Sequence, residues 1–158
     1  MDIDRAKKLI VVWGKVSEEG ALWIAEQNQR VLVPEQRPYL LGLKYNAGVL
    51  ESENIDWVYC TDNVLGLMFY EKRIDKVCLF CESIGGDKVE ILSGGLYIAL
   101  LAKIHNIPRH IFLQASFDLS SYDRDASTIE RKDFILDDSL NKYIIEPETE
   151  TIHEEVLS

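Results

Sequence analysis

The strongest constraint on the fold of this chain is the regular alternation of apolar segments with stretches that suit a helix. Five apolar segments predict strands: residues 9–13, 30–35, 55–60, 76–81 and 110–115. The stretches between the first four are just long enough for one helix each. Parallel strands need such crossovers, which place helices on both faces of a sheet. The pattern predicts an α/β fold, a three-layer α/β/α sandwich with a mainly parallel sheet.

Start and stop signals support these helices. Ser17 is a candidate N-cap for the first helix, Pro38 suits the first turn of the second, and Asp62 precedes the third. Asn106 and Pro108 end the fourth.

The length of 158 residues, 47% of them hydrophobic, is enough for one well-buried core. We expect residues 1–143 to form a single Rossmann-like domain. Residues 144–158 contain five glutamates and a proline. That composition is typical of a flexible acidic tail or of an arm for a partner subunit.

The charge balance excludes several functions. The 27 acidic and 17 basic residues give a net charge of -10, which repels nucleic acids and anionic membranes. No apolar run approaches the roughly 18 residues that span a bilayer, and the N-terminus lacks the pattern of a signal peptide. We expect a cytoplasmic protein without nucleic-acid or membrane partners.

Three cysteines lie in or beside apolar strand patterns, and Cys78 and Cys81 form a C-x-x-C pair. Residues three apart in a strand point to opposite faces of the sheet. This geometry favours reduced, buried thiols over a redox or metal pair. With the histidines scattered, we expect no metal site and no cofactor.

Ligands of such sheets bind outside the carboxyl ends of the strands. The third strand is followed by Thr61, Asp62 and Asn63, and the fourth by residues 82–87, which include a carboxylate and two glycines. A helix that starts there favours an anion by about 0.3–1 kcal/mol, which suits a phosphate or a sugar phosphate. Caps made by Asp62 and Ser93 explain the same residues equally well.

Residues 35–63 and 80–120 resemble the C-terminal domain of methylthioribose-1-phosphate isomerase. The same domain occurs in ribose-1,5-bisphosphate isomerase and in the alpha, beta and delta regulatory subunits of translation initiation factor two-B. The resemblance covers about residues 9–135. Three motifs carry it: Arg37-Pro38 followed by Gly42, Thr61-Asp62-Asn63, and the block from Ala102-Lys103 through Asn106-Ile107-Pro108 to Ser116-Phe117-Asp118.

The resemblance implies a site for a sugar phosphate or nucleotide at the strand exits. Glu82 matches the family's catalytic aspartate and is the candidate catalytic acid. Glycines permit close approach of a ligand to the backbone. The candidate ligand-binding residues are Arg37, Gly42, Thr61, Asp62, Asn63, Gly85, Gly86, Gly94 and Gly95.

Departures from the family pattern remove groups that isomerisation needs. The catalytic cysteine of the family falls near Trp13-Gly14-Lys15, where this chain has no thiol. The phosphate-holding Asn-Lys pair falls on Ile91-Leu92, and a family glutamine falls on Leu41. The family's N-terminal helical domain has no counterpart in this sequence. Without a positioned base and phosphate donors, turnover is not expected.

Two functions therefore remain open. The first is a non-catalytic or degenerate family member that acts through assembly, as a homodimer or with a related subunit, or by weak binding of a small phosphorylated ligand. The alternative is an aldose–ketose isomerase for a phosphorylated pentose, with a rearranged site or a separate N-terminal partner.

Overall fold

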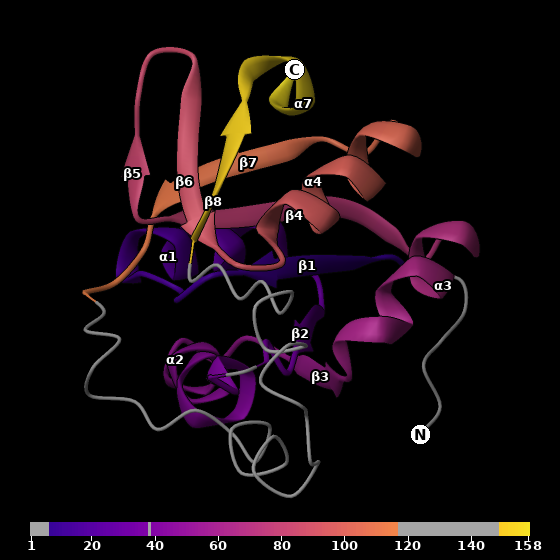
Figure 1. Cartoon of the computed structure of the whole chain (residues 1–158). Helices are drawn as coiled ribbons and strands as arrows, with labels where there is room; N and C mark the ends of the chain where they lie inside the picture. The colour runs from indigo at the N-terminus through magenta and orange to yellow at the C-terminus, as the bar shows by residue number, and fades with distance from the viewer. Residues whose placement is uncertain (1–6, 38, 117–148) are drawn as a thin grey trace, which may run out of the picture.

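A five-stranded parallel sheet forms the centre of the fold in a computed structural model that describes residues 7–37, 39–116 and 149–158 (Figure 1). The strand order is β3-β2-β1-β4-β7, and every neighbouring pair is parallel. The strands are β1 (Leu9–Trp13), β2 (Val31–Pro34), β3 (Trp57–Cys60), β4 (Ile74–Cys81) and β7 (Arg109–Leu113). All five predicted strands are confirmed, and so is the α/β fold.

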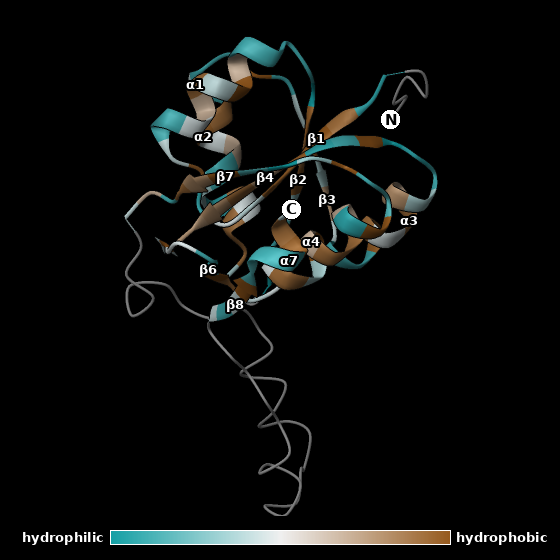
Figure 2. Ribbon diagram, turned by 90° about the horizontal axis from the view of Figure 1, so that it is seen from above, coloured by the Kyte–Doolittle hydropathy of each residue, from teal (hydrophilic) through white to brown (hydrophobic). Residues whose placement is uncertain are grey.

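Four helices cover the two faces of this sheet, as the view in Figure 2 shows. They are α1 (Glu18–Gln27), α2 (Ala47–Ser52), α3 (Leu65–Tyr70) and α4 (Gly95–Ile104). A π-helical turn, Gly42–Asn46, leads into α2, and a 3-10 turn, Asp62–Val64, leads into α3. Ser17 caps α1 as predicted, because its hydroxyl accepts a hydrogen bond from the Gly20 N–H at 3.3 Å.

The alternation of side chains along β1 divides the core into two layers. Leu9 and Val11 pack with α3 and α4 on one face, whereas Ile10 and Val12 pack with α1 and α2 on the other. All four side chains are fully or almost fully buried. The three-layer α/β/α arrangement follows from this division.

A second, antiparallel sheet was not predicted. It consists of β5 (Ser83–Ile84), β6 (Lys88–Leu92) and β8 (Thr149–His153), with the short helix α7 (Glu154–Leu157) after it. Within the stretch 144–158, for which we expect a flexible tail, residues 149–157 form this strand and helix. Ile152 is fully buried, and the β-branched residues around it suit a strand that adds to the free edge of β6. The polar stretch 117–143 lies outside the described residues.

The exit of β1 passes very close to β4 at Gly14. Gly14 has a φ of +92°, and a Cβ atom added there would lie 2.0 Å from the carbonyl oxygen of Phe80. Only glycine satisfies both the left-handed backbone and this approach. The β1 exit can therefore lie this close to β4 only because Gly14 has no side chain.

We expect Gly14→Ala to lower the free energy of unfolding by about 3 kcal/mol, because the substitution combines backbone strain with a clash against backbone atoms. Gly48→Ala is the matched control, since Gly48 lies on an exposed part of α2 with open space around it. That change should stabilise the protein by about 0.5–1 kcal/mol. Urea unfolding measures both, and equal effects of the two variants would contradict the close approach at Gly14.

Candidate functional site

Two buried amides join the exits of β1 and β2 at the carboxyl end of the sheet. The Gly14 N–H donates to Gln36 Oε1 at 2.8 Å, and Gln36 Nε2 donates back to the Gly14 carbonyl at 3.2 Å. Asn46 Nδ2 donates to the same carbonyl at 2.9 Å, and its Oδ1 accepts from the Val16 N–H at 2.9 Å. Gln36 is 3% exposed and Asn46 is fully buried. The chain's own side chains thus satisfy the backbone groups that a ligand would otherwise meet.

Asp62 holds the loop that leaves β2. Its Oδ1 accepts from the Gln36 N–H at 2.7 Å and its Oδ2 from the Arg37 N–H at 2.8 Å. The pKa of Asp62 is raised above its ordinary value, mainly by burial and also by the nearby charge of Glu35. The two backbone hydrogen bonds act in the opposite direction and lower the pKa. Asp62 therefore contacts the backbone of Arg37, and both are candidate ligand-binding residues. Its carboxylate is engaged in a loop rather than in a helix cap.

An apolar cluster lies beside this loop. It consists of Tyr39, Leu41 and Leu92, which are 6%, 1% and 4% exposed. The cavity that this cluster borders, between the β2 exit and the residues before α4, has a volume of about 10 Å³. Such a space is at the limit for one water molecule. A phosphate placed between these leucines would lose its hydrogen-bond partners, at a cost of several kcal/mol.

At three of the candidate glycines, other residues of the protein occupy the space where a side chain would lie. A Cβ atom added at Gly94, where φ is +102°, would lie 2.1 Å from Cζ2 of Trp13. One added at Gly95 would lie 2.3 Å from Cγ2 of Ile91, and one at Gly42 would lie 2.2 Å from the Pro34 carbonyl oxygen. The neighbours of these glycines therefore occupy the space that a side chain would take, and a ligand-binding role for Gly42, Gly94 and Gly95 stays a prediction.

The remaining candidates lie at the surface. Glu82 follows β4, and its N–H donates to the Glu90 carbonyl at 2.8 Å, within the strand pairing that continues into β5 and β6. Glu82, Gly85 and Gly86 are all exposed. Thr61 and Asn63 are exposed beside the 3-10 turn before α3. Glu82 therefore lacks the water-excluded surroundings in which a catalytic acid usually works.

Glu150, from β8, contacts the start of α4. Its Oε1 accepts from the Gly94 N–H at 2.5 Å and lies 3.5 Å from the Leu96 nitrogen. The N-cap position of α4 is Gly94, so Glu150 does the work that the sequence assigned to Ser93 as a cap. Sequence reasoning missed Glu150 because the glutamates around it suggested a disordered tail. The β-branched residues Thr149, Thr151 and Ile152 were the available strand signal.

Lys15 lies at the β1 exit, where the resemblance places the catalytic cysteine of the family. Lys15 is largely buried, with 8% of its surface exposed. Nζ donates to the Ser116 carbonyl at 2.7 Å and lies 4.2 Å from the centre of the Tyr45 ring, within cation–π range. The ammonium group therefore ties the β1 exit to the segment after β7.

The three thiols belong to the sheet. Cys78 packs on the face covered by α1 and α2, and Cys81 packs on the opposite face, as the strand geometry predicts. Burial raises the pKa of Cys60, Cys78 and Cys81 to about 12 in each case, so these groups stay protonated at neutral pH. A thiolate nucleophile is not available from them.

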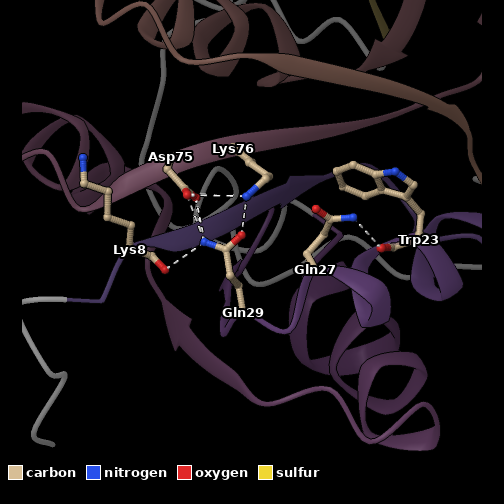
Figure 3. A network of polar contacts seen from close by, with 6 residues as sticks. All are labelled: Lys8, Trp23, Gln27, Gln29, Asp75 and Lys76. Atoms are coloured by element: carbon tan, nitrogen blue, oxygen red, sulfur yellow. Dashed lines mark hydrogen bonds and ion pairs between the residues drawn. The ribbon is translucent and has the colours of Figure 1, made fainter.

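Another cavity lies at the other end of the sheet, with a volume of about 660 Å³. Its lining comes from the ends of α1 and α2 and from the start of β1, and half of the lining residues are exposed. Beside it, the Gln29 amide donates to Asp75 at 3.0 Å and accepts from Lys76, as Figure 3 shows. This network fixes the loop before β2 to the start of β4.

Two further properties hold for the residues that the structure describes. No helix among them is long and apolar enough to cross a bilayer. No group of three or more histidine, cysteine, aspartate or glutamate residues in this part of the chain is arranged to hold a metal ion.

The sequence of this chain is similar to those of several known proteins. The family model described as the initiation factor 2 subunit family matches residues 16–117, more than half of the chain. A Methanocaldococcus jannaschii protein, provisionally named as a methylthioribose-1-phosphate isomerase, is 36% identical over 104 residues, which cover 65% of this chain and 32% of that protein. The methylthioribose-1-phosphate isomerase of Herpetosiphon aurantiacus is 32% identical over 104 residues, which cover 65% and 29%. The chain spans about a third of the length of these relatives.

Solved structures agree on the fold. The delta subunit of translation initiation factor eIF-2B from A. fulgidus matches with a TM-score of 0.68 and 20% identity, over 95% of this chain and 50% of that one. The 5-methylthioribose 1-phosphate isomerase from Pyrococcus horikoshii OT3 matches with a TM-score of 0.66 and 13% identity, over 96% and 48%. At these identities the likeness establishes the fold alone.

We expect Asp62→Ala to lower the free energy of unfolding by about 1–3 kcal/mol, because the partly buried N–H of Gln36 and the exposed N–H of Arg37 lose a charged acceptor. Asp56→Ala is the control. Asp56 pairs with Arg30 at 2.7 Å, but its side chain is 65% exposed, so its loss should cost less than about 1 kcal/mol. Urea unfolding at neutral pH compares the two. If Asp62→Ala costs no more than Asp56→Ala, the carboxylate does not hold the loop.

Proposed function

Because the chain belongs to the initiation factor 2 subunit family, we propose that it is a non-catalytic member that works through assembly with a second copy or a related subunit. The closed crevice at the carboxyl end of the sheet carries this proposal. Gln36 and Asn46 engage the Gly14 backbone there, and Leu41 and Leu92 leave a cavity of about 10 Å³ beside them.

The chemical groups at the strand exits also favour a non-catalytic role. Isomerisation of a sugar phosphate moves a proton or hydride between neighbouring carbons, and this needs an acid and a base in a dry pocket. Glu82 is exposed, and the thiols stay protonated in the core. The β1 exit offers the ammonium of Lys15, which is already engaged with Ser116.

An apolar surface on α3 and α4 supports assembly. The two helices lie side by side, and Tyr97 of α4 lies near Gly66 of α3. Large apolar side chains remain 40–76% exposed on this surface, which is more than a solvated helix face requires. They are Leu67, Tyr70, Tyr97, Leu100 and Ile104. The A. fulgidus structure is named as a subunit of an initiation factor, which agrees with work inside an assembly.

The names of the curated relatives favour a second candidate, an aldose–ketose isomerase for a phosphorylated pentose. In this case the site is rearranged, or a separate polypeptide supplies the parts that the longer relatives contain. Both candidates fit a cytoplasmic protein. They differ in turnover and in the role of Glu82.

A turnover assay separates the two candidates. The purified chain should convert methylthioribose-1-phosphate at the background rate, because loss of a catalytic acid or base typically costs about 10²–10⁴-fold in rate. Glu82→Gln and Glu71→Gln, which changes an exposed carboxylate after α3, should both leave that rate unchanged. Robust conversion that Glu82→Gln abolishes and Glu71→Gln does not would support the isomerase instead.

We expect the chain to form a twofold-symmetric dimer at micromolar concentration, because the α3–α4 surface is apolar and self-association is usually symmetric. Leu100→Asp should give a monomer, since a carboxylate would be desolvated in the interface. Leu22→Asp is the control on the opposite face of the sheet, where Leu22 is 50% exposed. Light scattering reports the mass. A wild-type monomer, or a dimer that survives Leu100→Asp, would contradict this surface as the interface.

A further inference from the structure

The exposed apolar residues of α4 form a stripe along one face of this helix. Tyr97, Leu100 and Ile104 are 46%, 40% and 71% exposed. Their spacing of i, i+3 and i+7 within Gly95–Ile104 places the three side chains on the same face. Helices that pair with each other make contact through residues at this spacing. The stripe therefore has the form of one half of a helix–helix contact.

α3 flanks the stripe and runs in the same direction as α4. Near the start of the two helices, the Tyr97 hydroxyl lies 3.1 Å from the place where a Cβ atom of Gly66 would be. Near their ends, the centre of the His105 ring lies 6.0 Å from the centre of the Phe69 ring. The starts of α3 and α4 thus lie together, and so do their ends.

No charged residue belongs to the stripe. Lys103 is the one charged residue of α4, and its ammonium group donates to the Glu155 carbonyl of α7. The sequence of α3, Leu65–Tyr70, contains no charged residue. An uncharged apolar surface is stabilised by burial against another such surface, whereas it cannot compensate the charges of a polar partner. A second copy of this chain offers an apolar surface of the same length and composition.

The shared direction of α3 and α4 favours one of the two ways in which a second copy can pack here. The dipoles of both helices point the same way, so a parallel arrangement would bring like ends of four helices together. An antiparallel arrangement sets the ends of the helices against the starts of their partners. In that arrangement Tyr97 lies opposite Ile104 of the second copy, and Leu100 lies beside the twofold axis.

We propose that α4 packs antiparallel against α4 of a second copy of this chain, with Leu100 beside the twofold axis and α3 flanking the contact. This inference rests on the proposed assembly and adds the identity and the orientation of the partner. Packed helices lie about 8–10 Å apart, so two residues beside the axis come close enough for a disulfide.

Cysteine cross-linking tests the position of the axis. Leu100→Cys should form a covalent dimer under mild oxidation at least about tenfold faster than Leu22→Cys, because the dimer holds the two new thiols at a high effective concentration. Leu22→Cys is the matched control, since Leu22 is 50% exposed on the opposite face of the sheet. The wild-type chain, with its three free cysteines, gives the background. A non-reducing gel reports the rates.

The orientation is tested with a mixture of two variants, Tyr97→Cys and isotope-labelled Ile104→Cys. Antiparallel helices should give mainly the mixed disulfide dimer, because Tyr97 lies opposite Ile104 of the second copy. Parallel helices would give dimers of each variant with itself. Mass spectrometry of the oxidised mixture distinguishes the three products.

The outcomes separate this inference from the proposed assembly. A wild-type monomer in light scattering would overturn both. A wild-type dimer in which Leu100→Cys cross-links no faster than Leu22→Cys would overturn the α4 contact and leave the assembly in place. A dimer in which the Tyr97→Cys and Ile104→Cys chains link only to themselves would overturn the antiparallel orientation.

Discussion

The close approach of Gly14 to the backbone of Phe80 is the constraint on which the carboxyl end of this sheet depends. It sets the path of the chain after β1, and this path presents the Gly14 N–H and carbonyl to the side chains of Gln36 and Asn46. Buried backbone groups need partners, so the loops that carry these two amides are drawn over the strand exits. Asp62 then fastens the β2 loop from the neighbouring exit.

The same fold supports different chemistry when the groups at the strand exits change. In this chain the family resemblance assigns a phosphate-holding pair to Ile91 and Leu92 and a glutamine to Leu41, and all three residues are buried. Trp13 fills the space against Gly94, and its indole N–H lies 3.3 Å from the Leu92 carbonyl. A carboxylate from β8 occupies the first turn of α4. Apolar packing and internal hydrogen bonds thus stand where a ligand-binding site would need donors and space.

The parts of this fold that could be predicted from the sequence are those set by local pattern. The apolar runs identified β1, β2, β3, β4 and β7, and the spacing between them predicted parallel pairing. The β6–β8 pairing joins Leu92 to Thr149, and no local pattern encodes a contact of that range. The site was less predictable because polar residues such as Gln36 and Glu150 gain their roles from partners across the fold. The motif that contains Asp62 was found, but its bonds to the β2 loop were not.

We infer that the chain's own side chains close this crevice against a sugar phosphate. An NMR titration of the full chain with methylthioribose-1-phosphate tests it most directly, because the Gly14, Gln36 and Gly94 amides report on the strand exits and on the start of α4. We expect these signals to stay in place up to about 1 mM ligand, where even a weak site of Kd near 1 mM would be half filled. A saturable shift of the same signals in the wild-type chain would contradict it.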